Sequence, residues 1–119
     1  MKLAIVGSRH YRNYKKFSKR VDKFIVENGY PTLIISGGAR GVDHMAEQYA
    51  EEHKIPIQIF PADWEQFGRA AGPIRNTDIV NACTHVLAFL ASGSKGTAST
   101  ISIAKAVHKP RTIINLDKL

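Results

Sequence analysis

The sequence His85-Val86-Leu87-Ala88-Phe89-Leu90 is followed, after two residues, by the loop Gly93-Ser94-Lys95-Gly96-Thr97. The apolar run is typical of a buried strand, and the residues after the loop have a helical pattern. Small residues let the backbone approach an anion closely, and a helix N-terminus directs unpaired N–H groups and a partial positive charge at the same place. The segment therefore predicts a phosphate site at a strand-to-helix turn. The spacing of its Gly, Lys and Thr residues differs from that of a P-loop motif.

Four further apolar runs of the strand type occur, and helical patterns alternate with the five runs. Near-continuous runs such as Leu33-Ile34-Ile35 suit strands covered on both faces, as in a parallel sheet, and spacings of about 25–30 residues fit βαβ units. A chain of 119 residues leaves room for one core, so we expect a single domain, residues 1–119. The sequence predicts an α/β fold, a Rossmann-like three-layer sandwich with a five-stranded parallel sheet in the order 3-2-1-4-5. The other four runs are residues 2–6, 32–36, 56–60 and 111–115.

In that strand order the direction of winding switches between the first and fourth strands, where open α/β sheets bind their ligands. Three loops meet there: Gly7-Ser8-Arg9-His10, Ser36-Gly37-Gly38-Ala39-Arg40-Gly41 and the loop before Thr97. Each is rich in glycine and serine and carries one cation, which is Arg9, Arg40 or Lys95. An anionic ligand is the simplest interpretation.

The net charge of +7 is concentrated near the N-terminus, because residues 1–23 hold eight Lys and Arg against one acid. Within that region Phe17, Val21, Phe24 and Ile25 recur at helical spacing and predict a core-facing stripe. The opposite face of this helix is basic, which indicates either a solvated surface or a contact with nucleic acid or another polyanion. The basic residues are Lys15, Lys16, Lys19, Arg20 and Lys23.

Several classes of protein are disfavoured by composition. No apolar stretch approaches the roughly 20 residues of a membrane span, and residues 2–6 are too short for the apolar region of a signal peptide, so we expect no membrane association and a cytoplasmic location. The single Cys83 permits no internal disulfide, and five scattered histidines lack ligand spacing. We therefore expect no metal and no cofactor.

Three ordered motifs resemble those of the SLOG superfamily. They are Ser36-Gly37-Gly38-Ala39-Arg40-Gly41-Val42-Asp43 with Ala46 and Glu47, then Gly72-Pro73-Ile74-Arg75-Asn76, then residues 93–97. The segment from Ala62 through Trp64 to Gly72 is similar to one in the small stand-alone YspA-like branch of that superfamily. The superfamily also includes the DNA-processing protein A domain and the Lonely-guy phosphoribohydrolases. The resemblance covers Lys2 to about Ile114 and implies a Rossmann-like pocket for nucleotides or nucleotide-derived ligands.

The loops and the resemblance together give a set of expected ligand-binding residues. Backbone N–H groups of Gly96 and Thr97, hydroxyl groups of Ser94 and Thr97 and the charge of Lys95 would bind phosphate. Arg75 is available to bind a phosphate through two parallel hydrogen bonds. The complete set is Gly7, Ser8, Arg9, Ser36, Gly37, Gly38, Arg40, Gly41, Asp43, Arg75, Asn76, Gly93, Ser94, Lys95, Gly96 and Thr97.

One departure from the resemblance concerns catalysis. The fourth loop of the Lonely-guy enzymes has a motif similar to Gly-Gly-x-Gly-Thr-x-x-Glu, and its Glu is used in catalysis. The aligned residue here is Thr100, which cannot act as a carboxylate acid or base. If the protein is an enzyme that hydrolyses nucleotide N-glycosidic bonds, the candidate catalytic residues are Asp43 and Asp63. Each also has a structural interpretation as a helix or turn cap, and Trp64 either stacks on a base or covers core or a subunit contact.

These observations give a leading hypothesis and two alternatives. The first is a domain that binds, and senses or hydrolyses, a nucleotide or ribosyl-phosphate ligand. The second is a single-stranded nucleic-acid binder resembling DNA-processing protein A, with the basic helix as a track for the backbone. The third is the N-glycosidic hydrolase. A homodimer is expected because a domain this small gains core by pairing.

Overall fold

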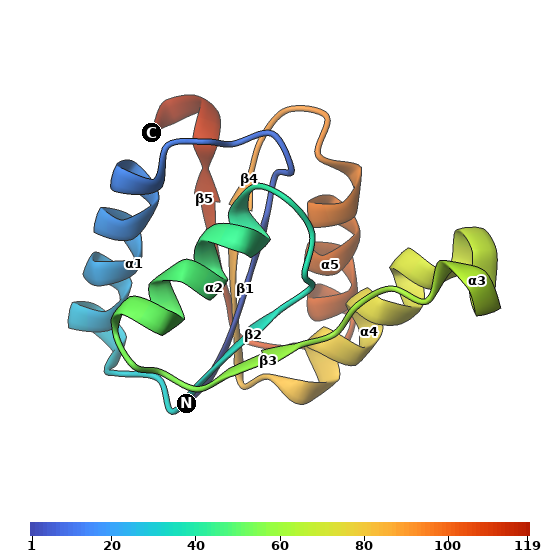
Figure 1. Ribbon diagram of the computed structural model, residues 1–119, viewed down its shortest axis with the longest axis horizontal. Coiled ribbons are helices and arrows are strands. Elements are labelled where there is room, and N and C mark those ends of the chain that lie inside the picture. The colour runs from blue at the N-terminus through green and yellow to red at the C-terminus, as the bar shows by residue number, and fades with distance from the viewer.

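In the computed structural model, which describes residues 1–119, five parallel strands form one sheet in the order β3-β2-β1-β4-β5, with helices on both faces (Figure 1). The predicted strand order and fold class are confirmed. The helices and strands are β1 (Lys2–Gly7), α1 (Tyr14–Asn28), β2 (Leu33–Ser36), α2 (Val42–Glu52), β3 (Ile57–Ile59), α3 (Trp64–Phe67), α4 (Ala71–Ala82), β4 (His85–Leu90), α5 (Lys95–Ala106) and β5 (Arg111–Asn115), with 3-10 turns at Gly68–Ala70 and Leu116–Lys118.

The two faces of the sheet carry different side chains because neighbouring strand residues point in opposite directions. On β1, Leu3 and Ile5 belong to the cluster formed with α1 and α2, while Ala4 and Val6 belong to the cluster formed with α4 and α5. The second cluster also contains Ala88 of β4, so small side chains predominate under α4 and α5. The result is a sandwich of three layers.

Helix α1 begins and ends where its sequence indicates. The Asn13 side chain accepts a hydrogen bond of 3.1 Å from the Lys16 N–H at the first turn, and Gly29 ends the helix at a φ of +96°. The predicted apolar stripe is buried at Phe17, Val21 and Phe24. The basic residues of this helix therefore lie on its outer side, where four of the five are exposed: Lys15, Lys16, Lys19 and Lys23.

Strand β3 departs from the expectation that every strand is covered on both faces. All three of its residues are exposed, because β3 is an edge strand and the chain does not pack back over it. Instead the chain runs outward to α3, which stands beyond α4 at the far end of the molecule (Figure 1). The one-turn helix α3 adds to the four helical patterns expected, and the Asp63 side chain caps it by accepting a 3.1 Å hydrogen bond from the Gln66 N–H.

No helix in this structure combines the length and the apolar character that crossing a membrane requires.

Gly41 holds the start of α2 against the loop that follows β1. The Val42 N–H donates a 3.1 Å hydrogen bond to the Ser8 carbonyl, and Gly41 has a φ of +72° and a ψ of −125°. A Cβ added at Gly41 would overlap the Ser8 carbonyl oxygen and lie 2.6 Å from the carbonyl carbon of Arg9. Only glycine permits both the conformation and the approach.

Gly41→Ala is expected to lower the free energy of unfolding by about 3 kcal/mol or more, since strain and backbone overlap add together. Gly29→Ala is the matched control, because Gly29 also has a positive φ but has no atom within 4 Å of an added Cβ; it should show the smaller loss, about 1–3 kcal/mol, since only the backbone conformation is strained. Urea denaturation of both variants measures the difference. Equal losses would contradict the role given to the Ser8 loop.

Candidate functional site

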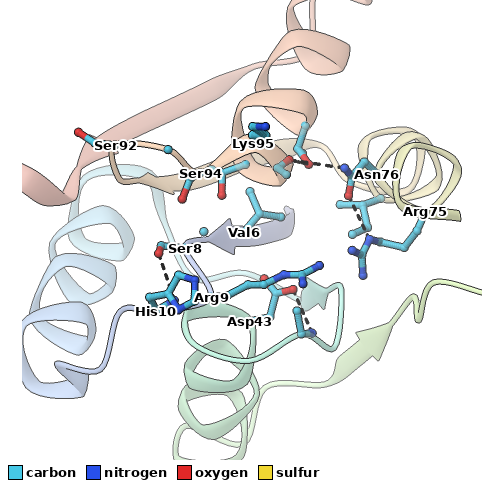
Figure 2. Close-up of a pocket in the computed structure, with 17 residues that line it drawn as sticks. Val6, Ser8, Arg9, His10, Asp43, Arg75, Asn76, Ser92, Ser94 and Lys95 are labelled. Carbon is cyan, nitrogen blue, oxygen red and sulfur yellow. Dashed lines mark hydrogen bonds between the residues drawn. The ribbon is translucent and has the colours of Figure 1, made fainter. Parts of the chain in front are cut away.

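A cavity of about 340 Å³ opens at the carboxyl ends of β1 and β4 (Figure 2). It lies between the loop after β1, the first turn of α2, the middle of α4 and the start of α5. Parallel strands place these loops at one edge of the sheet, and the chain leaves β1 and β4 toward opposite faces. Of the expected ligand-binding residues, the structure brings eleven together here: Gly7, Ser8, Arg9, Asp43, Arg75, Asn76, Gly93, Ser94, Lys95, Gly96 and Thr97.

The start of α5 presents free hydrogen-bond donors to the cavity. Gly93 turns the chain at a φ of +79°, and the Lys95 N–H donates to the Gly93 carbonyl over 2.9 Å. The N–H groups of Gly96 and Thr97 make no hydrogen bond within the chain, and the Ser94 side chain does not cap the helix. These donors and the positive end of the helix dipole suit an oxyanion.

Arg75 is held in place by two direct hydrogen bonds and by the contact that Asn76 makes with α5. Its Nη1 donates to the Gly37 carbonyl over 2.6 Å, and its Nε donates to the Asn76 side-chain oxygen over 3.0 Å. Asn76 is buried, and its amide nitrogen lies 3.5 Å from the Gly96 carbonyl on α5. This chain of bonds links the loop after β2 to α4 and α5, so the guanidinium is positioned before any ligand arrives.

The cavity is strongly positive. In Figure 2 the Arg9 side chain extends across the cavity toward Arg75. Burial lowers the pKa of Arg75; the Asp43 carboxylate opposes that shift, and the nearby charge of Arg9 adds to it. Neither arginine has a carboxylate partner, because the only ion pair within the chain joins His53 to Asp22 at 4.0 Å. Two facing guanidiniums repel each other, and an anion between them would relieve that repulsion.

Asp43 is the only acidic residue that lines the cavity. It lies in the first turn of α2, is 6% exposed, and its Oδ2 accepts a 3.2 Å hydrogen bond from the Ala39 N–H. Burial raises the pKa of Asp43 to about 6, although the Ala39 hydrogen bond and the charges of Arg75 and Arg9 oppose the shift. A carboxyl group with this pKa exchanges protons near neutral pH.

The remaining expected residues lie elsewhere. Ser36 is fully buried, and its hydroxyl is occupied within the fold: it donates to the Asp43 carbonyl and accepts from the Gly38 N–H. Gly41 packs against the backbone of Ser8 and Arg9 in the loop after β1 and does not line the cavity. Asp63, a candidate catalytic residue, caps α3 and does not line the cavity. The other three expected residues line a neighbouring hollow: Gly37, Gly38 and Arg40.

Sequence reasoning did not select three polar residues that line the cavity, His10, Ser92 and Thr100. His10 and Ser92 stand in the same loops as selected residues, so their position in the chain was the available signal. Thr100 lies one helical turn after Gly96, and its hydroxyl donates to the Gly96 carbonyl over 3.2 Å. Its i+4 spacing could have placed it on the cavity side of α5.

The raised pKa of Asp43 predicts a pH dependence of stability. Because the native state holds this proton more tightly than the unfolded chain, the stabilisation is complete below pH 4 and is lost as the pH rises through about 6. Asp43→Asn keeps an acceptor for the Ala39 N–H and cannot ionise. Wild type should therefore lose about 2 kcal/mol relative to this variant between pH 4 and pH 7.5, measured by urea denaturation in phosphate-free buffer. A constant difference would contradict the assignment.

The fold and this edge of the sheet define a Rossmann-like domain with a ligand crevice at its switch point. Residues 1–67 match the profile of the YspA, cpYpsA-related SLOG family, and the chain belongs to that family. It is also 31% identical over 115 residues to the Gene 61 protein of Mycobacterium phage D29, with 92% of each chain covered. The resemblance to the SLOG superfamily inferred from the glycine motifs is confirmed.

Two solved structures share the fold. DNA processing protein A (DprA) of Streptococcus pneumoniae is similar with a TM-score of 0.74 and 22% identity, covering 96% of this chain and 50% of that one. DNA processing protein A of Helicobacter pylori is similar with a TM-score of 0.66 and 22% identity, covering 95% of this chain and 64% of that one. The chain thus spans between half and two thirds of the length of these proteins.

Proposed function

We propose that this protein binds a nucleotide or a nucleotide-derived phosphate compound in the cavity between β1 and β4, with residues 1–119 acting as one nucleotide-binding domain. The observation that carries the proposal is the pair of unused N–H groups at Gly96 and Thr97, facing a cavity that also receives Arg9, Arg75 and Lys95. A phosphate at the start of α5 would satisfy both N–H groups within the positive field of Lys95 and the two arginines.

The size and lining of the cavity support a small organic phosphate. Its volume of about 340 Å³ falls in the range of roughly 300–1,000 Å³ typical of small-molecule pockets. Most of its lining residues carry polar side chains and only three are hydrophobic, Val6, Ala39 and Ile79, so hydrogen bonding and charge are available for recognition. Ser94 and His10 supply further polar groups beyond the phosphate.

Lys95→Ala and Lys105→Ala form a matched pair for testing this proposal. Both lysines are exposed on α5, but Lys95 lines the cavity and Lys105 lies in the last turn. Nucleoside monophosphates at about 100 times their dissociation constant should raise the free energy of unfolding by roughly 2.7 kcal/mol, and the parent nucleosides should not. Lys95→Ala should weaken binding about 5- to 10-fold, and Lys105→Ala should leave it unchanged.

Calorimetric titration with AMP, GMP, CMP and UMP measures these affinities. Equal binding of nucleosides and nucleotides, or no binding of any of them, would contradict the proposal. Release of free base in the same samples would add the hydrolase activity, for which Asp43 is the carboxyl group that lines the cavity.

A second candidate function is the binding of single-stranded nucleic acid through α1. Its supporting observation is the row of exposed Lys15, Lys16, Lys19 and Lys23, none of which pairs with an Asp or Glu side chain; only Lys16 has a partner, the Leu119 oxygen at 3.4 Å. The structure of the Helicobacter pylori protein is described as showing a single-stranded DNA binding mode, although likeness at 22% identity extends to the fold alone. Phosphate contacts along such a helix would need no base recognition.

Lys19→Ala with Lys23→Ala tests this alternative against Lys2→Ala with Lys105→Ala, which removes the same charge from exposed positions away from α1. If α1 follows a DNA backbone, the first pair should reduce the slope of log affinity against log salt concentration for a thymidine oligonucleotide by about 1.4. The second pair should leave the slope unchanged. Fluorescence anisotropy measures both, and no binding in 20 mM salt would exclude this function.

A further inference from the structure

Beside the main cavity lies a second hollow of about 360 Å³ whose lining combines three arginines with the single tryptophan of the chain. Arg9, Ala39 and Arg75 line both spaces, so the two are neighbours, while Arg40 and Trp64 line only the second. No acidic residue lines this hollow. It therefore extends the positive region of the main cavity outward, past the loop that follows β2.

The three arginines of this hollow form no ion pair within the chain. None of the three arginines has a carboxylate within ion-pair distance, and the side chains of Arg9 and Arg40 make no hydrogen bond within the chain. Arg75 donates hydrogen bonds to Asn76 through Nε and to Gly37 through Nη1, and its Nη2 makes no hydrogen bond within the chain. Asp43, the carboxylate whose charge acts on Arg9 and Arg75, lines the main cavity and not this hollow. Three guanidiniums with free donors around one hollow are suited to bind a phosphate group.

Trp64 is too exposed to serve the core. It is 53% exposed at the start of α3, and the edge of its ring lies near Gly72, where an added Cβ would be 3.5 Å from the ring. One edge of the indole thus lies against the first turn of α4, and the rest of the ring is accessible beside the arginines. Aromatic faces next to positive charge are platforms on which nucleobases stack.

We infer that this second hollow is a subsite for another phosphate and base, and that the ligand is a dinucleotide-type compound with two nucleosides and at least two phosphate charges. One phosphate binds at the start of α5, the second binds among Arg9, Arg40 and Arg75, and one base stacks on Trp64. The inference rests on the proposed nucleotide function of the main cavity. A soluble pyrophosphate-linked dinucleotide and a phosphodiester strand both provide this chemistry.

The experiment compares three ligands by calorimetry and by the fluorescence of Trp64, which is the only tryptophan. The ligands are AMP, diadenosine diphosphate and the 5′-phosphorylated deoxyadenosine dinucleotide. At least one dinucleotide should bind tenfold or more tightly than AMP and should quench the tryptophan, whereas AMP should leave the fluorescence nearly unchanged. The dinucleotide that binds more tightly identifies the source of the second phosphate.

Arg40→Ala should bring the ratio of dinucleotide to AMP affinity close to one. Its matched control is Arg69→Ala, an exposed arginine beside α3 that does not line the hollow and should preserve the ratio. If AMP binds but neither dinucleotide binds more tightly, or if the ratio survives Arg40→Ala, the second subsite is wrong and the proposed function stands. If none of the three ligands binds, both are wrong.

Discussion

The parallel pairing of β1 with β4 is the constraint from which the site follows. These central strands run in register from Leu3 opposite His85 to Gly7 opposite Phe89, and the Ser8 N–H extends the pairing by donating to the Phe89 carbonyl over 3.2 Å. The chain leaves β1 toward α1 and leaves β4 toward α5, on opposite faces of the sheet. Two loops are thereby brought to one edge with a crevice between them, and small residues in both loops keep it open.

A second set of bonds makes the crevice electrostatically specific. Arg75 is bonded to Gly37 and to Asn76, which approaches Gly96, so α4 supplies a fixed positive group between the two halves of the edge. Arg9 enters the same space without a carboxylate partner, and buried Asp43 resists ionisation. The repulsion between Arg9 and Arg75 costs the empty protein stability and favours the binding of an anion.

The sequence predicted the sheet well because its signals are local. Apolar runs marked each strand, and Gly29 and Asn13 bounded α1 through conformations that the residues themselves prefer. The loops of the candidate site were likewise found, since their positions follow from strand order. Two of the selected residues lie outside the cavity because of tertiary structure: the Ser36 hydroxyl bonds inside the fold, and Asp63 caps a helix that extends away from the sheet. The exposure of β3 and Trp64 depends on where the chain travels after β3, which no local pattern specifies.

The central claim is that a phosphate binds at the start of α5. The measurement that tests it most directly is a titration of ¹⁵N-labelled protein with AMP, followed by amide chemical shifts. The account predicts that the largest shifts occur at Gly96 and Thr97, with further shifts at Ser8 and Arg9 across the cavity. Shifts confined to the basic surface of α1, or no shifts at saturating AMP, would contradict it.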